Sequence, residues 1–245
     1  MKKKTVWSFI ILMMTCANVF AQDDTTKIFS AEQAREIERI ASDYFVSHPE
    51  ILVKAMQKLE QEQAKLHEKQ VSESGEFYRR DASTPKIGDA SKRHYLVEFF
   101  DYNCGYCKVM EPVLKKLSED HKISLQIVYV NIPIIGKNSA MSATVAQALY
   151  SLHPDKFAQL HGKLMRNEID ANEMDALKTE IENMGIKWDE IMHEMQSRRP
   201  QNKLQEDIKK SRELGITGTP YLIIDGKEYR GAITSEDDLR KLLGD

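Results

Sequence analysis

The chain has 245 residues and a formal net charge of −3, from 35 basic and 38 acidic side chains. This length fits one domain of ordinary size with an appendage, or two small domains. The mildly acidic balance argues against a basic surface for nucleic acid, and three cysteines are too few for a disulfide scaffold.

Residues 1–21 have the three-part pattern of a secretory signal peptide. Lys2, Lys3 and Lys4 precede an apolar run over residues 6–14, and a small residue, Ala21, marks the expected cleavage point. The apolar run is too short for a membrane anchor, which needs about 20 residues. Acylation of Cys16 as in a lipoprotein is the alternative, and Thr15 before it fits that type of site poorly.

Cleavage after Ala21 removes three lysines and Cys16, which leaves 32 basic and 38 acidic residues, a net charge of −6, and two cysteines. Thiols of exported proteins tend to be paired because the compartment is oxidising. Cys104 and Cys107 would close so short a loop that a structural disulfide would add little stability. The pair is therefore interpreted as a redox site.

Residues 22–74 are predicted to be a helical N-terminal region. Ser30 and Gln33 have the spacing of a capping box, and a second helix is expected to start at residues 47–50, where Ser47 and Glu50 repeat the pattern. Residues 71–75 are the expected linker. The second helix carries a seam at heptad spacing, made of Leu52, Met56, Leu59, Gln63 and Leu66. Self-association through residues 30–70 is favoured over packing onto the chain's own main domain.

Residues 75–245 are predicted to form an α/β domain. A strand over 95–100, a helix over 105–119 and a strand over 125–132 come first. A helical block follows at about 137–202, with helices expected at 139–152, 155–166, 172–184 and 188–197. A helix over 204–214, a hairpin of strands 221–224 and 228–231 around Asp225-Gly226, and a helix over 236–243 complete the order.

The two cysteines lie at the predicted strand-to-helix transition. The first turn of a helix has unpaired N–H groups and the positive end of the dipole, and both favour a thiolate. Cys104 is therefore predicted to be an exposed nucleophile, and Cys107, one turn deeper, to be a shielded thiol that resolves mixed disulfides.

Cys104 and Cys107 have three other possible uses. Structural zinc needs four ligands and this motif supplies two. A haem attachment site would have histidine where Lys108 stands. An inert disulfide is the third alternative.

Residues 98–108, with Gly218-Thr219-Pro220 far downstream, resemble the DsbA-like thioredoxin-fold disulfide oxidoreductases. Within them the chain is most similar to the oligomeric ScsC/Com1-type branch with a helical N-terminal extension. The resemblance implies a thioredoxin fold with a helical insertion in residues 75–245. It also implies that Cys104 is the nucleophile and Cys107 the resolving thiol.

The resemblance assigns further residues. It implies a cis peptide bond before Pro220, which would expose the backbone of Thr219 for pairing with an extended substrate; an ordinary turn is the alternative. Glu98 matches a buried acid that assists the resolving thiol, and we expect a raised pKa there, with an exposed strand face as the alternative. Tyr106 is near the sulfurs by its place in the sequence, independently of the resemblance, and is expected to contact substrate; a plain surface aromatic beside the site is the alternative.

The Gly105-Tyr106 dipeptide and Thr219 resemble the dimeric isomerases rather than the strong monomeric oxidase. The predicted function is a periplasmic disulfide isomerase with some oxidase or reductase activity. Expected partners are misfolded exported proteins, a membrane redox protein of DsbB or DsbD type, and further copies in a homodimer or homotrimer. No cofactor or metal is expected besides the redox-active Cys104–Cys107 disulfide. A dedicated oxidase, a copper-handling protein that uses the two thiolates, and a chaperone without redox chemistry are the alternatives.

Overall fold

The computed structural model describes residues 28–88, 91–120, 124–136 and 138–244. The predicted signal peptide and Cys16 lie outside these residues. Within them, no helix is long and apolar enough to cross a membrane. The chain divides into two compact units between Lys58 and Leu59, and each is described separately below.

The N-terminal unit contains helix α1 (Ala31–Ser47) and the start of α2 (Pro49–Arg80). The capping box is confirmed, because Ser30 and Gln33 each bond the other's backbone N–H. The second capping pattern was wrong. Ser47 belongs to α1, where its hydroxyl bonds backbone carbonyls one turn back, and α2 begins at Pro49, a residue that the first turn of a helix accepts.

The expected linker at residues 71–75 is instead helical and part of α2. Val71 and Tyr78 are buried in the second unit against β-strand residues such as Phe99. Gly75 lets the helix approach closely, because a Cβ there would lie 2.7 Å from the Tyr95 hydroxyl and 2.9 Å from a methyl of Ile223. Apolar contacts with the sheet thus keep this segment helical where local sequence indicated a break.

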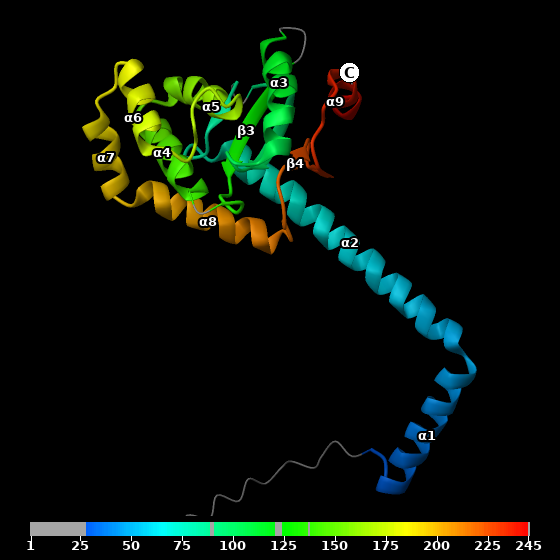
Figure 1. The fold of residues 1–245 in the computed structure, drawn as a ribbon. Coiled ribbons are helices and arrows are strands. Elements are labelled where there is room, and N and C mark those ends of the chain that lie inside the picture. The colour runs from blue at the N-terminus through cyan, green and yellow to red at the C-terminus, as the bar shows by residue number, and fades with distance from the viewer. Residues whose placement is uncertain (1–27, 89–90, 121–123, 137, 245) are drawn as a thin grey trace, which may run out of the picture. The chain divides into compact units, whose positions relative to one another are not determined.

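The second unit is built on a five-stranded sheet in the order β1-β3-β2-β4-β5 (Figure 1). Strands β2 and β3 are parallel, and the other neighbours are antiparallel. Every residue of the central strand β2 is buried, whereas every residue of the edge strand β5 is exposed. The two-residue strand β1 was not predicted. The strands are β1 (Lys86–Ile87), β2 (His94–Phe100), β3 (Leu125–Asn131), β4 (Tyr221–Ile224) and β5 (Lys227–Arg230).

Two apolar clusters cover the two faces of β2. Tyr95, Val97 and Phe99 pack with α2 residues, while Leu96 and Phe100 pack with α3 (Gly105–Glu119) and the helical insertion. Because side chains alternate along a strand, Glu98 must share the face of Leu96 and Phe100. This alternation places a carboxyl group under the helix that carries the two cysteines.

The helical insertion gathers around α4, which contacts α5, α6, α7 and α8 (Figure 1). Most predicted bounds hold within two or three residues, but α8 begins five residues before the expected Leu204, because Pro200 is accepted in a first turn. The remaining elements are α4 (Ser139–Leu152), the short 3-10 helix η1 (Pro154–Lys156), α5 (Phe157–Met165), α6 (Met174–Asn183), α7 (Trp188–Gln196), α8 (Arg199–Glu213) and α9 (Glu236–Leu243).

Candidate active site

Cys104 is the N-cap residue of α3, as the strand-to-helix placement predicted. Its sulfur accepts a hydrogen bond from the backbone N–H of Cys107 at 3.3 Å. The free N–H groups of the first turn therefore point toward the sulfur, which is the geometry that stabilises a thiolate.

The pKa of Cys104 is lowered from its ordinary value of 9.0 to about 6. The largest cause is the hydrogen bond with the Cys107 side chain. The backbone N–H groups of Cys107 and Tyr106 act in the same direction, and the net effect is a lowered pKa although burial acts in the opposite direction. At neutral pH the sulfur is thus largely a thiolate.

The prediction that Cys104 is exposed was wrong, because only 3% of its surface is accessible. The loop before β4 lies against it, and the protonated thiol donates a hydrogen bond to the Thr219 carbonyl at 3.3 Å. The peptide bond between Thr219 and Pro220 is cis, as expected. Residues 98–108 and residues 218–220, which are 110 residues apart in the sequence, therefore meet at the Cys104 sulfur.

Cys107 is fully buried, and both cysteines are free thiols in this structure. Burial raises the pKa of Cys107 far above its ordinary range, and the hydrogen bond with Cys104 and the charge of Glu98 raise it further. Cys107 thus stays protonated under conditions in which Cys104 is ionised, so the two thiols have different chemistry although they are three residues apart.

The carboxyl group of Glu98 is fully buried, which excludes the alternative of an exposed strand face. Burial raises its pKa well above 4.5, and the charges of Glu111 and Cys104 raise it further; contact with the Cys107 thiol acts in the opposite direction. The expected direction of the pKa shift is confirmed. The raised pKa lets this carboxyl group bind a proton at a higher pH than an exposed carboxyl group would, next to the Cys107 thiol.

Two residues of this cluster were missed at the sequence level. His161 of α5 is fully buried, with Nε2 at 3.4 Å from Glu111 Oε2 and Nδ1 at 3.2 Å from the Tyr102 hydroxyl. Glu111 was predictable in principle, because it follows Cys107 by one helical turn and so shares its face. No signal in the sequence pairs His161 with it.

Tyr106, between the two cysteines, is 72% exposed. It points out of the core beside the reactive sulfur. Nothing in the described residues covers its ring, so it is available to an incoming molecule.

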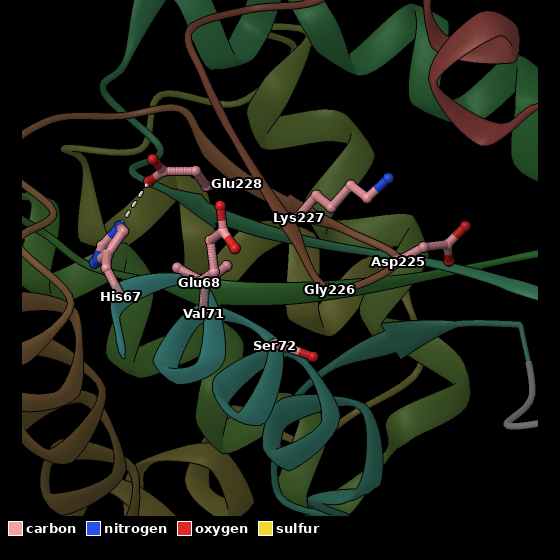
Figure 2. Close-up of a pocket in the computed structure, with 8 residues that line it drawn as sticks. All are labelled: His67, Glu68, Val71, Ser72, Asp225, Gly226, Lys227 and Glu228. Atoms are coloured by element: carbon pink, nitrogen blue, oxygen red, sulfur yellow. Dashed lines mark hydrogen bonds and ion pairs between the residues drawn. The ribbon is translucent and has the colours of Figure 1, made fainter. Parts of the chain in front are cut away.

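A separate hollow of about 570 Å³, whose lining includes neither Cys104 nor Cys107, lies between α2 and the β4–β5 turn (Figure 2). An ion pair of 3.2 Å between His67 and Glu228 closes one side of it. Its lining residues are His67, Glu68, Val71, Ser72, Asp225, Gly226, Lys227 and Glu228. In the described part of the chain, no group of three or more His, Cys, Asp or Glu side chains is placed to hold a metal ion.

The fold and the paired thiols define a thioredoxin-like protein with an asymmetric Cys-x-x-Cys site. Residues 95–244 match the DSBA-like thioredoxin domain family. Because this match covers more than half of the chain, the chain belongs to this family of DsbA-like thiol–disulfide oxidoreductases. Residues 33–65 match the N-terminal domain of the copper resistance protein ScsC, so the chain is of the ScsC type, as the sequence resemblance predicted.

Solved structures agree with this assignment. ScsC of Proteus mirabilis in a transitional conformation is 26% identical, with a TM-score of 0.61 over 88% of this chain and 97% of that one. A periplasmic thioredoxin-like protein from Salmonella enterica serovar Typhimurium is also 26% identical, with a TM-score of 0.55 over 67% of this chain and 90% of that one.

A curated relative, the probable disulfide bond formation protein D of Bacillus cereus, is 23% identical over 142 residues. The match covers 54% of this chain and 65% of that protein, just under two thirds of its length.

Proposed function

We propose that this protein is a periplasmic thiol–disulfide oxidoreductase that acts on exported proteins, mainly as a disulfide isomerase. The observation that carries the proposal is the asymmetry of the two thiols. One has a pKa of about 6 at the start of α3, and the other is buried with a raised pKa. Thiol–disulfide exchange needs one ready nucleophile and one reserve thiol.

The reaction begins when the Cys104 thiolate attacks a wrong disulfide of the client. One S–S bond breaks, a Cys104–client mixed disulfide forms, and the electron pair leaves on the second client sulfur as a thiolate. In isomerisation, another client thiolate attacks the client sulfur of the mixed disulfide. This step forms the new client disulfide and returns Cys104 as a thiolate, with no net redox change.

When no client thiol attacks, Cys107 resolves the mixed disulfide between Cys104 and the client. Cys107 gives its proton to Glu98 and attacks the Cys104 sulfur, which forms the Cys104–Cys107 disulfide and releases the client sulfur as a thiolate. The client is then reduced by two electrons and the protein is oxidised by two. In this proposal Glu98 is the general base for Cys107, and a membrane protein of DsbB or DsbD type resets the redox state.

Client binding is assigned to the residues around the sulfur. The backbone of Thr219 next to Pro220 would pair with an extended client segment, as in strand addition. The exposed Tyr106 ring would contact the same segment. Together they would hold a client cysteine within reach of Cys104 without requiring any particular client sequence.

Isomerisation is favoured over dedicated oxidation by the N-terminal region. The α1 helix has no buried residue, and the apolar side chains of Leu52, Met56, Leu59 and Leu66 on α2 are exposed. Association of residues 30–70 into a homodimer or homotrimer would cover them, and several catalytic domains would then face one client. We infer that residues 22–74 are this oligomerisation region and residues 75–245 the catalytic domain.

The test compares two substrates, scrambled ribonuclease and fully reduced ribonuclease. The mature protein is expected to recover activity from the scrambled substrate faster than from the reduced one. Cys104→Ala is expected to abolish both activities. Deletion of residues 22–58, which leaves Val71 and Tyr78 in the core of the second unit, is expected to give a monomer that has lost mainly isomerisation. Full activity of Cys104→Ala would contradict every redox role, and faster oxidation than isomerisation would favour the dedicated oxidase.

A copper-handling role is the second candidate, because the family model matched by residues 33–65 describes a copper resistance protein. Two thiolates suit the soft ion Cu(I). Competition with a Cu(I) chelator measures this directly. Tight binding that Cys104→Ser and Cys107→Ser each abolish would support it, and binding that survives in both variants would exclude these thiols as the site.

A further inference from the structure

Asn103, the residue immediately before Cys104, forms a reciprocal hydrogen-bonded pair with Asn172, which lies in the loop over 166–173 between α5 and α6. Its Nδ2 atom donates to Asn172 Oδ1 at 3.0 Å, and its Oδ1 atom accepts from Asn172 Nδ2, also at 3.0 Å. The Nδ2 atom also donates to the Ser139 hydroxyl at 2.8 Å. Both N–H groups and the carbonyl of this amide therefore have partners in the helical insertion.

The same loop makes a second contact with the active-site helix, just after the second cysteine. The ammonium group of Lys108 donates to Asn167 Oδ1 at 2.5 Å. Asn167 has a φ of 56°, in the left-handed region, where asparagine is found more often than most residues. Because Asn103 precedes Cys104 and Lys108 follows Cys107, the loop binds the Cys-x-x-Cys segment at both of its ends.

The loop is itself firmly attached to the second unit. Ile169 and Ala171 are buried members of the larger apolar cluster. Between them, Asp170 Oδ1 accepts the backbone N–H of Asn172 at 2.8 Å and its Nδ2 atom at 3.1 Å. These bonds orient the Asn172 amide toward its partner, so the loop can act as a fixed support for the residue before Cys104.

The position of Asn103 affects how well the Cys104 sulfur meets its hydrogen-bond donors. That sulfur accepts the Cys107 N–H at 3.3 Å across the first turn of α3. Hydrogen bonds weaken as distance and angle depart from their optimum, and Asn103 is the residue through which the preceding turn is joined to Cys104. Loosening Asn103 would therefore weaken the stabilisation of the thiolate although both cysteines remain.

We propose that Asn172 is a positioning residue that acts through Asn103 to hold the Cys104 sulfur against the N–H groups of the first turn of α3. This inference rests on the proposed role of Cys104 as the nucleophile. It adds the helical insertion to the parts of the chain that control the reactivity of that sulfur, from a position almost 70 residues further along the sequence.

The test uses the full mature protein and measures the pH midpoint of Cys104 alkylation by iodoacetamide, together with the redox equilibrium against glutathione. Asn172→Ala should raise the midpoint by at least about half a pH unit. At a pH above both midpoints, its reduced form should be about threefold less stable relative to the disulfide. Asn183→Ala, an exposed asparagine at the other end of α6, is the matched control and should change neither value.

The Asn103→Ala variant shows whether Asn172 acts through this contact. It should raise the midpoint at least as much, and adding Asn172→Ala to it should produce no further shift, because the shared contact is already lost. If Asn172→Ala fails to fold, Asn103→Ala removes the same pair from the other side and decides the question.

Asn167→Gly tests the second contact of the loop. Glycine accepts the positive φ, so this variant removes the bond to Lys108 and keeps the backbone. It should raise the midpoint less than Asn172→Ala does, because Lys108 lies beyond both cysteines. A larger shift in Asn167→Gly would assign the control to Lys108 and overturn the role of Asn172.

A lowered free energy of unfolding in Asn172→Ala with an unchanged midpoint and an unchanged glutathione equilibrium would show a merely structural role and overturn the proposal. So would an equal shift from Asn172→Ala with and without the Asn103 side chain. Failure of the unmodified reduced protein to react with oxidised glutathione would instead refute the proposed oxidoreductase function, so the two failures are distinct.

Discussion

The N-terminal helices and the surroundings of Glu98 depart from the usual distribution of side chains in opposite ways. Along α1 and the first half of α2, apolar residues such as Ile40, Tyr44 and Met56 are exposed. Around Glu98, ionisable groups are fully buried under α3. Both arrangements cost free energy in an isolated chain.

The comparison of these two regions indicates what offsets the free-energy cost of each arrangement. An exposed apolar stripe is offset if a partner covers it, as we propose for the N-terminal region. The cost of a buried acid is reduced by a raised pKa, which makes its site sensitive to pH. We therefore expect substitutions in the first region to change assembly, and substitutions in the second to change rates and pH dependence.

The largest effect is expected for Glu98→Gln. Because the amide cannot accept the Cys107 proton, release of the mixed disulfide should slow by roughly 10²- to 10⁴-fold, the usual range for a lost general base. Rapid mixing with a preformed mixed disulfide measures this step. Glu119→Gln, at the exposed end of α3, is the control and should have no effect. An unchanged rate in Glu98→Gln would contradict the role of Glu98 as the base.

The next effect is expected for Met56→Glu in the predicted seam. Complete burial of such a side chain contributes about 1.5–3 kcal/mol. Since every copy loses this contact and gains a charge, the dissociation constant should rise at least roughly a hundredfold. Sedimentation velocity measures the change. Gln57→Glu adds the same charge one residue away from the seam and should leave the assembly intact; a monomeric unmodified protein would contradict the oligomer itself.

The third effect concerns how the free energy of unfolding depends on pH. Glu98 has a folded pKa above its unfolded value of 4.5, so the native state binds the extra proton. Its contribution to the free energy of unfolding is therefore largest below pH 4.5 and is lost as pH rises, by about 1.4 kcal/mol per unit until the folded pKa is passed. Urea unfolding of the reduced protein measures this slope, and Glu98→Gln should flatten it. An equal slope in both proteins would contradict the prediction.

The smallest effect is expected at Cys104. Alkylation of the reduced protein by iodoacetamide should have a midpoint near pH 6. Cys107→Ala removes the thiol whose hydrogen bond is the largest cause of the lowered pKa, a contribution of about 0.5–1.5 kcal/mol, and should raise the midpoint by roughly 0.4–1.1 units. The lowered pKa stabilises the folded protein with a Cys104 thiolate above pH 9, and this stabilisation is lost as pH falls through 6. A midpoint near 9 would show that the sulfur lacks these donors.

Most of the fold could be predicted from the sequence because its signals are local. The bounds of α3, α4 and α9 follow from apolar spacing, and the hairpin follows from Asp225-Gly226. The helical continuation at Val71 and Gly75 was not predictable in the same way, since it depends on packing against Tyr95 and Ile223, which are distant in the sequence.

The candidate site, like the fold, contains residues that could be predicted from the sequence and residues that could not. Cys104 and Cys107 were found because their place at the start of a helix is a local signal, whereas Glu98 and Pro220 were found by resemblance. The burial of Cys104 was not predicted because it results from contact with Thr219, a residue more than a hundred positions away in the sequence. The pairing of Glu111 with His161 was missed for the same reason, since only the packing of α5 on α3 brings them together.

The exposed edge strand β5 has a consequence for the proposed function, which brings unfolded chains to this protein. Open strand edges recruit other strands, and sheet growth from such an edge leads to aggregation. Lys227, Glu228 and Arg230 place charges along this edge, and the opposite edge, β1, is only two residues long. Both borders of the sheet therefore discourage other strands from joining it, so that, under the proposed function, a bound client would leave again after its disulfide has been exchanged.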